Sequence, residues 1–176
     1  MELRSFILLL TVLAGMGCSG DVSREKQENS GRIKEHLVNA NKIFVEKEAE
    51  QIAAYQERHK LTMSITGTGL RYVIFRKSAG EIYPVPGDTV ELNYQVWLLD
   101  GTPCYDTKNS TESFTLGKAQ MPRGMEEAVE MMQAGDSSVI IIPSHLGYGF
   151  TGDGDKIPGN AATICYMSLK KIYKPS

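Results

Sequence analysis

The later part of the chain contains a segment in which hydrophobic residues recur at every second position. Val90, Leu92, Tyr94, Val96 and Leu98 are separated by mostly polar residues. Alternation with a period of two is typical of a strand that buries one face. The Asp100-Gly101 pair that follows favours a tight turn, so the segment predicts the first strand of a hairpin.

Other short apolar segments predict further strands of the same sheet. Val139–Ile142 is β-branched and wholly apolar, which indicates a buried strand. Turn-forming Gly and Pro clusters separate these segments. The remaining predicted strands are Leu70–Lys77, Phe114–Leu116 and Thr163–Tyr173.

One short helix is expected within this domain. Met125, Ala128, Val129 and Met132 lie at helical spacing in a segment that runs from Arg123 to Ala134. Pro122 stands at its start, where a missing N–H costs the helix nothing, and Gly135 is suited to its end. A glycine-rich loop from Ser144 to Ala161 follows, and loops this long in a compact domain are usually functional or disordered.

A longer amphipathic helix is predicted before this domain, within a helical segment over residues 31–62. Its apolar residues could pack on the chain's own domain or form the seam of a homodimer, and the sequence leaves both open. Residues 18–30 are polar and predict a solvated tether. The apolar positions of the helix are Ile33, Leu37, Ala40, Phe44, Ala49 and Ile52.

The first 17 residues have the pattern of an export signal. Arg4 precedes an apolar run from Phe6 to Gly17, which is too short to cross a bilayer as a helix. Small residues end the run, and Cys18 follows. The segment resembles a bacterial lipoprotein signal in which Cys18 is lipidated. It departs from that signal at Gly15, because the position three before the cysteine usually holds an aliphatic residue. The alternative is an ordinary cleaved signal with an incidental cysteine.

Composition narrows the remaining function classes. The 176 residues suit one domain with an appendage, and the net charge of −2 gives no basic footprint for nucleic acid. His36, His59 and His145 lack the spacing of metal ligands, so we expect no metal and no cofactor. Cys104 and Cys165 could pair, but nothing in their spacing fixes their separation, and we favour two buried thiols.

Several short motifs occur together in an order that resembles the FKBP-type peptidyl-prolyl cis-trans isomerases. They are Pro86-Gly87-Asp88, Asp100-Gly101, Tyr105-Asp106, Leu116-Gly117-Lys118, Arg123-Gly124-Met125-Glu126-Glu127-Ala128, Leu146-Gly147-Tyr148-Gly149 and Ile157-Pro158-Gly159-Asn160-Ala161. The resemblance implies an FKBP-like domain over 67–176. Its fold would be α+β, an antiparallel twisted half-barrel wrapped on one short helix and preceded by the long N-terminal helix.

The resemblance also implies the residues of an isomerase site. Tyr148, Asp106 and Tyr94 match positions that the family uses in catalysis, and Tyr148 would bond a ligand carbonyl through its hydroxyl. The substrate-binding positions implied are Tyr105, Phe114, Met121, Pro122, Met125, Ile157 and Cys165.

Tyr105 stands where the family usually has a wall phenylalanine, and three further positions depart from the family's pattern. Met125 replaces the usual floor tryptophan, Cys165 replaces a wall phenylalanine, and Pro122 lacks the backbone N–H that the family offers to a bound carbonyl. We therefore expect a wider pocket that binds its substrate less tightly. The function implied is isomerisation of prolyl bonds in exported proteins, and the alternative is a binding or chaperone module with weak or no catalysis.

The combined features imply a place and partners for the protein. They are similar to exported lipoproteins of Gram-negative bacteria, which implies attachment through Cys18 to the outer membrane, facing the periplasm. The expected partners are proline-containing polypeptides, with a homodimer through the N-terminal helix as a further possibility.

Overall fold

The computed structural model describes residues 20–175, with side chains from residue 30 onward. The chain divides into two compact units after Phe44, inside helix α1 (Gly20–Arg58). The second unit, which begins at Val45, contains the last turns of α1 and every other element. It therefore starts earlier than the domain expected from residue 67.

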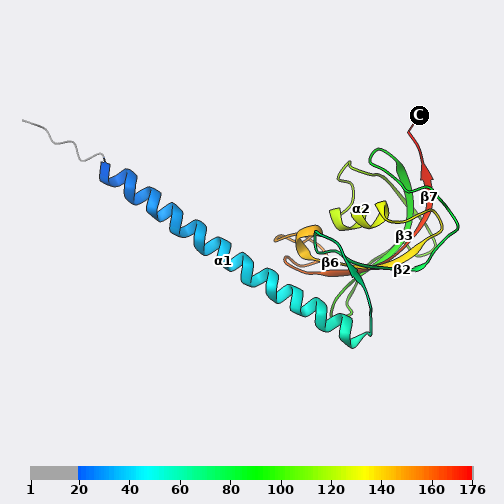
Figure 1. Ribbon diagram of the computed structural model, residues 1–176, viewed down its shortest axis with the longest axis horizontal. Helices are drawn as coiled ribbons and strands as arrows, with labels where there is room; N and C mark the ends of the chain where they lie inside the picture. Colours follow the sequence, from blue (N-terminus) through cyan, green and yellow to red (C-terminus); the bar gives the residue numbers. More distant parts are fainter. Residues whose placement is uncertain (1–19, 176) are drawn as a thin grey trace, which may run out of the picture. The chain divides into compact units, whose positions relative to one another are not determined.

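The second unit is built on one antiparallel sheet that curls about helix α2 (Figure 1). The strands follow the order β1-β2-β6-β7-β3-β4, and β5 also pairs with β3. This arrangement confirms the expected α+β class and the hairpin at Asp100-Gly101. The strands are β1 (Ser64–Ile65), β2 (Arg71–Arg76), β3 (Thr89–Leu98), β4 (Pro103–Asp106), β5 (Glu112–Thr115), β6 (Ser137–Ile142) and β7 (Thr163–Tyr173).

The register of the sheet explains which side chains share its inner face. Cys165 of β7 lies opposite Val96 on β3 and Ile140 on β6. All three are buried in the larger hydrophobic core cluster, and Tyr94 packs against it. Because strand side chains alternate between faces, the period-two pattern of the sequence fixes this inner row.

Helix α2 (Arg123–Glu130) fills the concave side of the sheet and buries Met125, Ala128 and Val129. It ends at Glu130, before the expected end at Ala134. The backbone N–H groups of Met131 and Met132 bond to carbonyls three residues back, which tightens the last turn and stops the helix.

Helix α1 begins at Gly20, so residues 20–30, expected as a tether, are helical. Their Glu, Lys, Arg and Gln are good helix formers, which explains the extension. Near its other end, Ile52 and Tyr55 are buried in a second cluster with sheet residues such as Val139 and Ile164. Packing on the chain's own domain therefore holds for this end of the helix.

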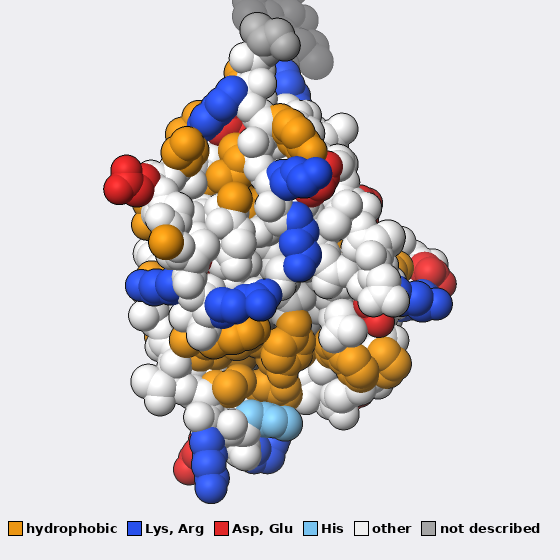
Figure 2. Space-filling model, turned by 90° about the vertical axis from the view of Figure 1, so that its right-hand side faces the viewer, with side chains coloured by type: hydrophobic (Ala, Val, Ile, Leu, Met, Phe, Trp, Pro, Cys, Tyr) orange, Lys and Arg blue, Asp and Glu red, His pale blue; other side chains and the backbone are white. Residues whose placement is uncertain are grey.

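Some apolar side chains stay exposed. Ile33 and Leu37 of α1 are 56% and 65% exposed, and Phe75 on β2 is 63% exposed. Figure 2 shows one face on which hydrophobic side chains gather beside lysine and arginine side chains. Scattered exposed residues are normal, whereas grouped ones indicate an interaction surface.

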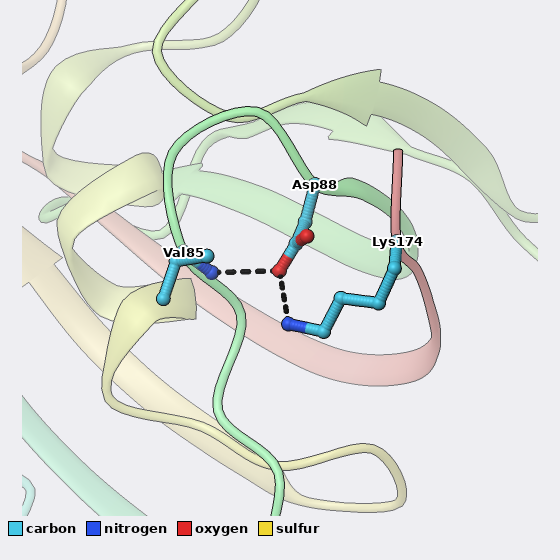
Figure 3. A network of polar contacts seen from close by, with 3 residues as sticks. All are labelled: Val85, Asp88 and Lys174. Carbon is cyan, nitrogen blue, oxygen red and sulfur yellow. Dashed lines mark hydrogen bonds and ion pairs between the residues drawn. The ribbon is translucent and has the colours of Figure 1, made fainter. Parts of the chain in front are cut away.

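A buried carboxylate fixes the turn that leads into β3. Asp88 is 1% exposed, and its Oδ2 accepts bonds from the Val85 N–H at 2.8 Å and from Lys174 Nζ at 2.7 Å (Figure 3). The Lys174 bond, the Val85 bond and the nearby ammonium charge lower the pKa of Asp88 despite its desolvation. The pair joins the segment after β7 to the start of β3.

Cys104 and Cys165 are buried free thiols, as favoured from the sequence. Burial raises the pKa of both, so neither is an activated nucleophile. Across residues 20–175, no helix combines the length and apolar character that crossing a bilayer requires. The proposed signal and Cys18 lie outside the described residues.

Candidate functional site

The structure brings eight of the ten expected site residues into one apolar cluster at the concave side of the sheet. They come from strands β3, β4, β5 and β7, from α2, and from the loops before α2 and before β7. Four are buried and four are half-buried, so the cluster reaches the surface. The buried four are Phe114, Met125, Ile157 and Cys165, and the half-buried four are Tyr94, Tyr105, Met121 and Tyr148.

The other two expected residues lie outside the cluster. Asp106 is exposed, and its carboxylate accepts bonds from the Lys108 N–H at 2.6 Å and from Gln95 Nε2 at 3.2 Å. Pro122 is the N-cap of α2, and its carbonyl accepts the N–H of Met125 at 2.9 Å. Asp106 thus stabilises a turn, while Pro122 lies at the start of helix α2, which places Met125 in the cluster.

Two of the three site tyrosines are tied to carboxylates. The Tyr94 hydroxyl donates to Glu112, and the Tyr105 hydroxyl donates to Asp153. Burial and the Glu112 bond raise the pKa of Tyr94, and the Asp153 bond and burial raise that of Tyr105. Both hydroxyls therefore stay protonated, and the carboxylates hold the two rings in place.

The third tyrosine, Tyr148, has an uncommitted hydroxyl. It is half-buried, and its hydroxyl has no hydrogen-bond partner among the residues whose side chains the structure describes. Burial, followed by the charge of Asp153, raises its pKa to about 12, so it remains a donor at neutral pH. Of the three hydroxyls, this one is free to bond the carbonyl of a bound peptide.

Asp153 organises the loop that carries Tyr148 and Ile157. Its Oδ1 accepts the backbone N–H groups of Asp155, Lys156 and Ile157 at 2.9, 3.0 and 2.8 Å. Burial opposes its ionisation, but the Tyr105 bond and these backbone bonds outweigh it and lower the pKa of Asp153 to about 2. A carboxylate that accepts several N–H groups is a stable anchor for a turn.

Two glycines let the same loop fold back on itself. A Cβ on Gly152, which has φ of +71°, would lie 2.1 Å from the Ile157 carbonyl oxygen. A Cβ on Gly159 would lie 2.0 Å from the Phe150 carbonyl oxygen. The loop is therefore closely packed backbone against backbone, and it presents Ile157 to the cluster as a buried side chain.

Sequence reasoning missed Glu112 and Asp153 as the partners of the site tyrosines. A signal for Asp153 exists, since an Asp before Gly-Asp-Lys is suited to an Asx turn. Glu112 has no such signal, because its bond to Tyr94 depends on the pairing of β5 with β3.

The arrangement suits chemistry without a covalent step. It offers an apolar surface, one free hydroxyl donor and two inert thiols. In the described part of the chain, no group of His, Cys, Asp and Glu residues could hold a metal ion. Such a surface can desolvate and orient a bound peptide.

Comparison with known proteins points the same way. The family model described as FKBP-type peptidyl-prolyl cis-trans isomerase matches residues 80–169, which is half of the chain. The chain is 28% identical over 150 residues to a probable FKBP-type peptidyl-prolyl cis-trans isomerase, FkpA, of Neisseria meningitidis, covering 85% of this chain and 54% of the relative. It is 35% identical over 88 residues to human peptidyl-prolyl cis-trans isomerase FKBP9, covering 49% of this chain and 15% of the relative. The chain thus spans about half the length of the first relative and far less of the second.

Two solved structures share the fold. The crystal structure of FkpA from Escherichia coli has a TM-score of 0.64 at 24% identity, covering 90% of this chain and 75% of that one. A peptidyl-prolyl cis-trans isomerase from Pseudomonas syringae has a TM-score of 0.65 at 21% identity, covering 76% of this chain and 96% of that one. Together, the sheet wrapped on α2, the clustered site positions and the family match show that this chain belongs to the FKBP-type peptidyl-prolyl cis-trans isomerase family.

Proposed function

We propose that this protein is a peptidyl-prolyl cis-trans isomerase that acts on proline-containing polypeptides. The observation that supports this best is the Tyr148 hydroxyl, which has no partner among the described side chains and adjoins an apolar cluster. In a member of this family, that combination suits a bound X-Pro segment better than it suits core packing.

The chemistry requires only rotation about one amide bond. Amide resonance sets a barrier of ~18–20 kcal/mol, and uncatalysed rotation takes ~10–100 s. An apolar surface favours the twisted, less polar amide over the planar one. The Tyr148 hydroxyl would hold a neighbouring carbonyl and so fix the orientation of the peptide.

The remaining site residues have proposed roles that follow from their positions. Tyr94 and Tyr105 would be rigid walls because carboxylates hold their hydroxyls. Met125 and Cys165 would form a softer, roomier floor and wall than aromatic residues would. Phe114, Met121 and Ile157 would complete the apolar lining, and Asp106 would act only through its turn.

Pro122 is proposed to weaken substrate binding. It stands where the family offers a backbone N–H, and proline has none. One missing net hydrogen bond is worth ~0.5–1.5 kcal/mol. We expect measurable but modest catalysis as a result.

Isomerisation of short X-Pro peptides tests the proposal directly. We expect Tyr148→Phe to lower kcat/KM by about 2- to 13-fold, the equivalent of one net hydrogen bond. Tyr83→Phe is the matched control, because Tyr83 is 51% exposed and lies outside the cluster. A wild-type rate equal to the uncatalysed rate, in protein shown to be folded, would refute the enzymatic function.

A second candidate is an FKBP-fold binding or chaperone module. The exposed apolar side chains Ile65, Phe75 and Tyr166, at 62%, 63% and 43% exposure, favour it because they could bind unfolded polypeptide. Suppression of aggregation of an unfolded client would be measured for wild type and for Tyr148→Phe. Equal suppression by both proteins, together with no isomerase activity in either, would support this candidate alone.

We also propose export and lipid anchoring at Cys18, with attachment to the outer membrane facing the periplasm of a Gram-negative cell. The support is the sequence of residues 1–18. Incorporation of labelled fatty acid into wild type but not into Cys18→Ser would support anchoring. Recovery of unlabelled wild-type protein in the soluble envelope fraction would contradict it.

A homodimer through α1 is the remaining proposal on partners. Ile33 and Leu37 lie one turn apart and are more than half exposed in the single chain. Light scattering of the wild type should give the mass of a dimer, and Leu37→Lys should give the mass of a monomer. A monomeric wild type at micromolar concentration would exclude this role.

A further inference from the structure

A buried carboxylate on α1 reaches the loop that carries Tyr148. Glu48 is 4% exposed, one turn before Ile52, which is buried against the outer face of the sheet. Its Oε1 accepts the backbone N–H of Ser144 at 2.8 Å, across 96 positions of sequence. Burying a carboxylate is costly unless it is bonded, so this contact defines where the helix meets the loop.

The position of that contact explains why a carboxylate is needed there. Ser144 opens the 3₁₀ turn η1 (Ser144–Leu146), and its N-cap is Pro143, which provides no side-chain cap bond. The N–H groups at the start of a helical turn lack partners within the turn. Glu48 provides the missing acceptor from a distant element.

The same Ser144 also binds both neighbours of Tyr148. Its carbonyl accepts the N–H of Gly147 at 3.0 Å and that of Gly149 at 2.8 Å. The Gly149 carbonyl in turn accepts the N–H of Asn160 at 2.8 Å, which ties the two ends of the loop together. A shift of Ser144 would therefore move the backbone on both sides of Tyr148.

We propose that Glu48 is a positioning residue for the isomerase site, acting through Ser144 on Tyr148. The inference rests on the proposed function of Tyr148 as the donor to the substrate carbonyl. On this proposal, the last turns of α1 help to hold the backbone beside Tyr148 in position. The facing charge is Arg71, which lines the same cleft of about 280 Å³ and interacts electrostatically with Glu48.

The test combines activity with a cycle of substitutions in the full chain. We expect Glu48→Ala to lower kcat/KM on X-Pro peptides by about 2- to 13-fold, the equivalent of one net hydrogen bond. Glu48→Gln should retain most of the activity, because its amide oxygen can still accept the Ser144 N–H. Glu50→Ala, at an exposed position of the same helix, is the matched control and should leave activity unchanged.

Coupling to Tyr148 separates positioning from a general structural role. In a Tyr148→Phe background, Glu48→Ala should change kcat/KM by less than about 2-fold, because residues acting through one another are not additive. The amide resonances of Gly147 and Gly149 should shift in Glu48→Ala and return in Glu48→Gln.

Several results would overturn the inference. One is a Glu48→Ala protein that loses thermal stability but keeps wild-type activity per folded molecule. Another is an undiminished effect in the Tyr148→Phe background. If neither wild type nor Tyr148→Phe is active, the proposed function fails, and unshifted Gly147 and Gly149 amides would independently refute the positioning role.

Discussion

Substituting Gly152 should damage the site by displacing the loop that carries Ile157. Its backbone has φ of +71°, and an added Cβ would lie 2.1 Å from the Ile157 carbonyl oxygen and 2.8 Å from the Gly159 nitrogen. Gly154, two residues further on, has φ of +79° but has nothing within 4 Å of an added Cβ. Gly152→Ala and Gly154→Ala thus share the conformational cost, and only the first creates a clash.

The size of the effect follows from these distances. A left-handed conformation costs a non-glycine residue ~1–2 kcal/mol, and both variants incur this cost. Ordinary contact begins at 3.4 Å, so in Gly152→Ala the Ile157 carbonyl must move by about 1.3 Å. That movement breaks the bond from the Asp153 N–H to the Ile157 carbonyl, now 3.0 Å long, and displaces Ile157 from the cluster.

A displacement of this size has a known scale of effect on catalysis. Misplacing a positioning group by ~1 Å can cost ~10²-fold in rate. We expect Gly152→Ala to lower kcat/KM on an X-Pro peptide by about 10- to 100-fold, and Gly154→Ala by less than about 3-fold. The assay would follow formation of the trans peptide from a cis-enriched sample, with thermal unfolding measured in parallel. Equal activity of the two variants would show that the loop does not position the site.

Three other predictions concern stability. Asp136→Ala should lower the unfolding free energy by about 2 kcal/mol in chemical denaturation, because the N–H groups of Ser78 and Gln133, 2.6 and 2.9 Å from its carboxylate, lose their acceptor. Gly124→Ala should lower the free energy of unfolding by about 1–3 kcal/mol through overpacking, because the new Cβ would lie 2.6 Å from Ile142 Cγ2. A thermal unfolding midpoint equal to that of wild type would contradict this. The folded-state pKa of Asp153, about 2, lies below the value of ~3.9 expected in the unfolded chain. The contribution of ionised Asp153 to the free energy of unfolding is therefore complete above about pH 4 and is lost as the pH falls towards 2. Measuring the unfolding free energy of wild type and of Asp153→Asn across this pH range would detect the loss.

The strands were predictable because their signal is local. The span Thr163–Tyr173 of β7 agrees with its expected bounds, and the alternating segment around Tyr94 forms β3. Alternation with period two also determines which side chains face inward. Most of the expected site residues meet in one cluster for that reason, since they lie on inward-facing strand positions or in loops beside them.

What the sequence did not reveal depends on contacts between distant segments. The bonds from Tyr94 to Glu112, from Tyr105 to Asp153 and from Ser144 to Glu48 join different elements and have no local pattern. The early end of α2 has a different origin, because local bonds from the Met131 and Met132 N–H groups to carbonyls three residues back tighten its last turn. Helix propensity alone also gave no boundary at residue 31, since the nearby residues from Arg24 to Glu28 are good helix formers.

The place of β7 in the sheet has a consequence for how the protein is made. β7 is the last strand in sequence among residues 20–175, yet it lies between β6 and β3 and pairs with both along their lengths. Before residues 163–173 leave the ribosome, the nascent chain therefore contains two separate parts of the sheet, β1-β2-β6 and β3 with β4 and β5. Each part has an open edge, and the strand that joins them is missing. Pairings this distant in sequence form slowly, and open edges are prone to aggregation. The domain must consequently reach its fold only after synthesis of its final strand, in one late step rather than progressively from the N-terminus.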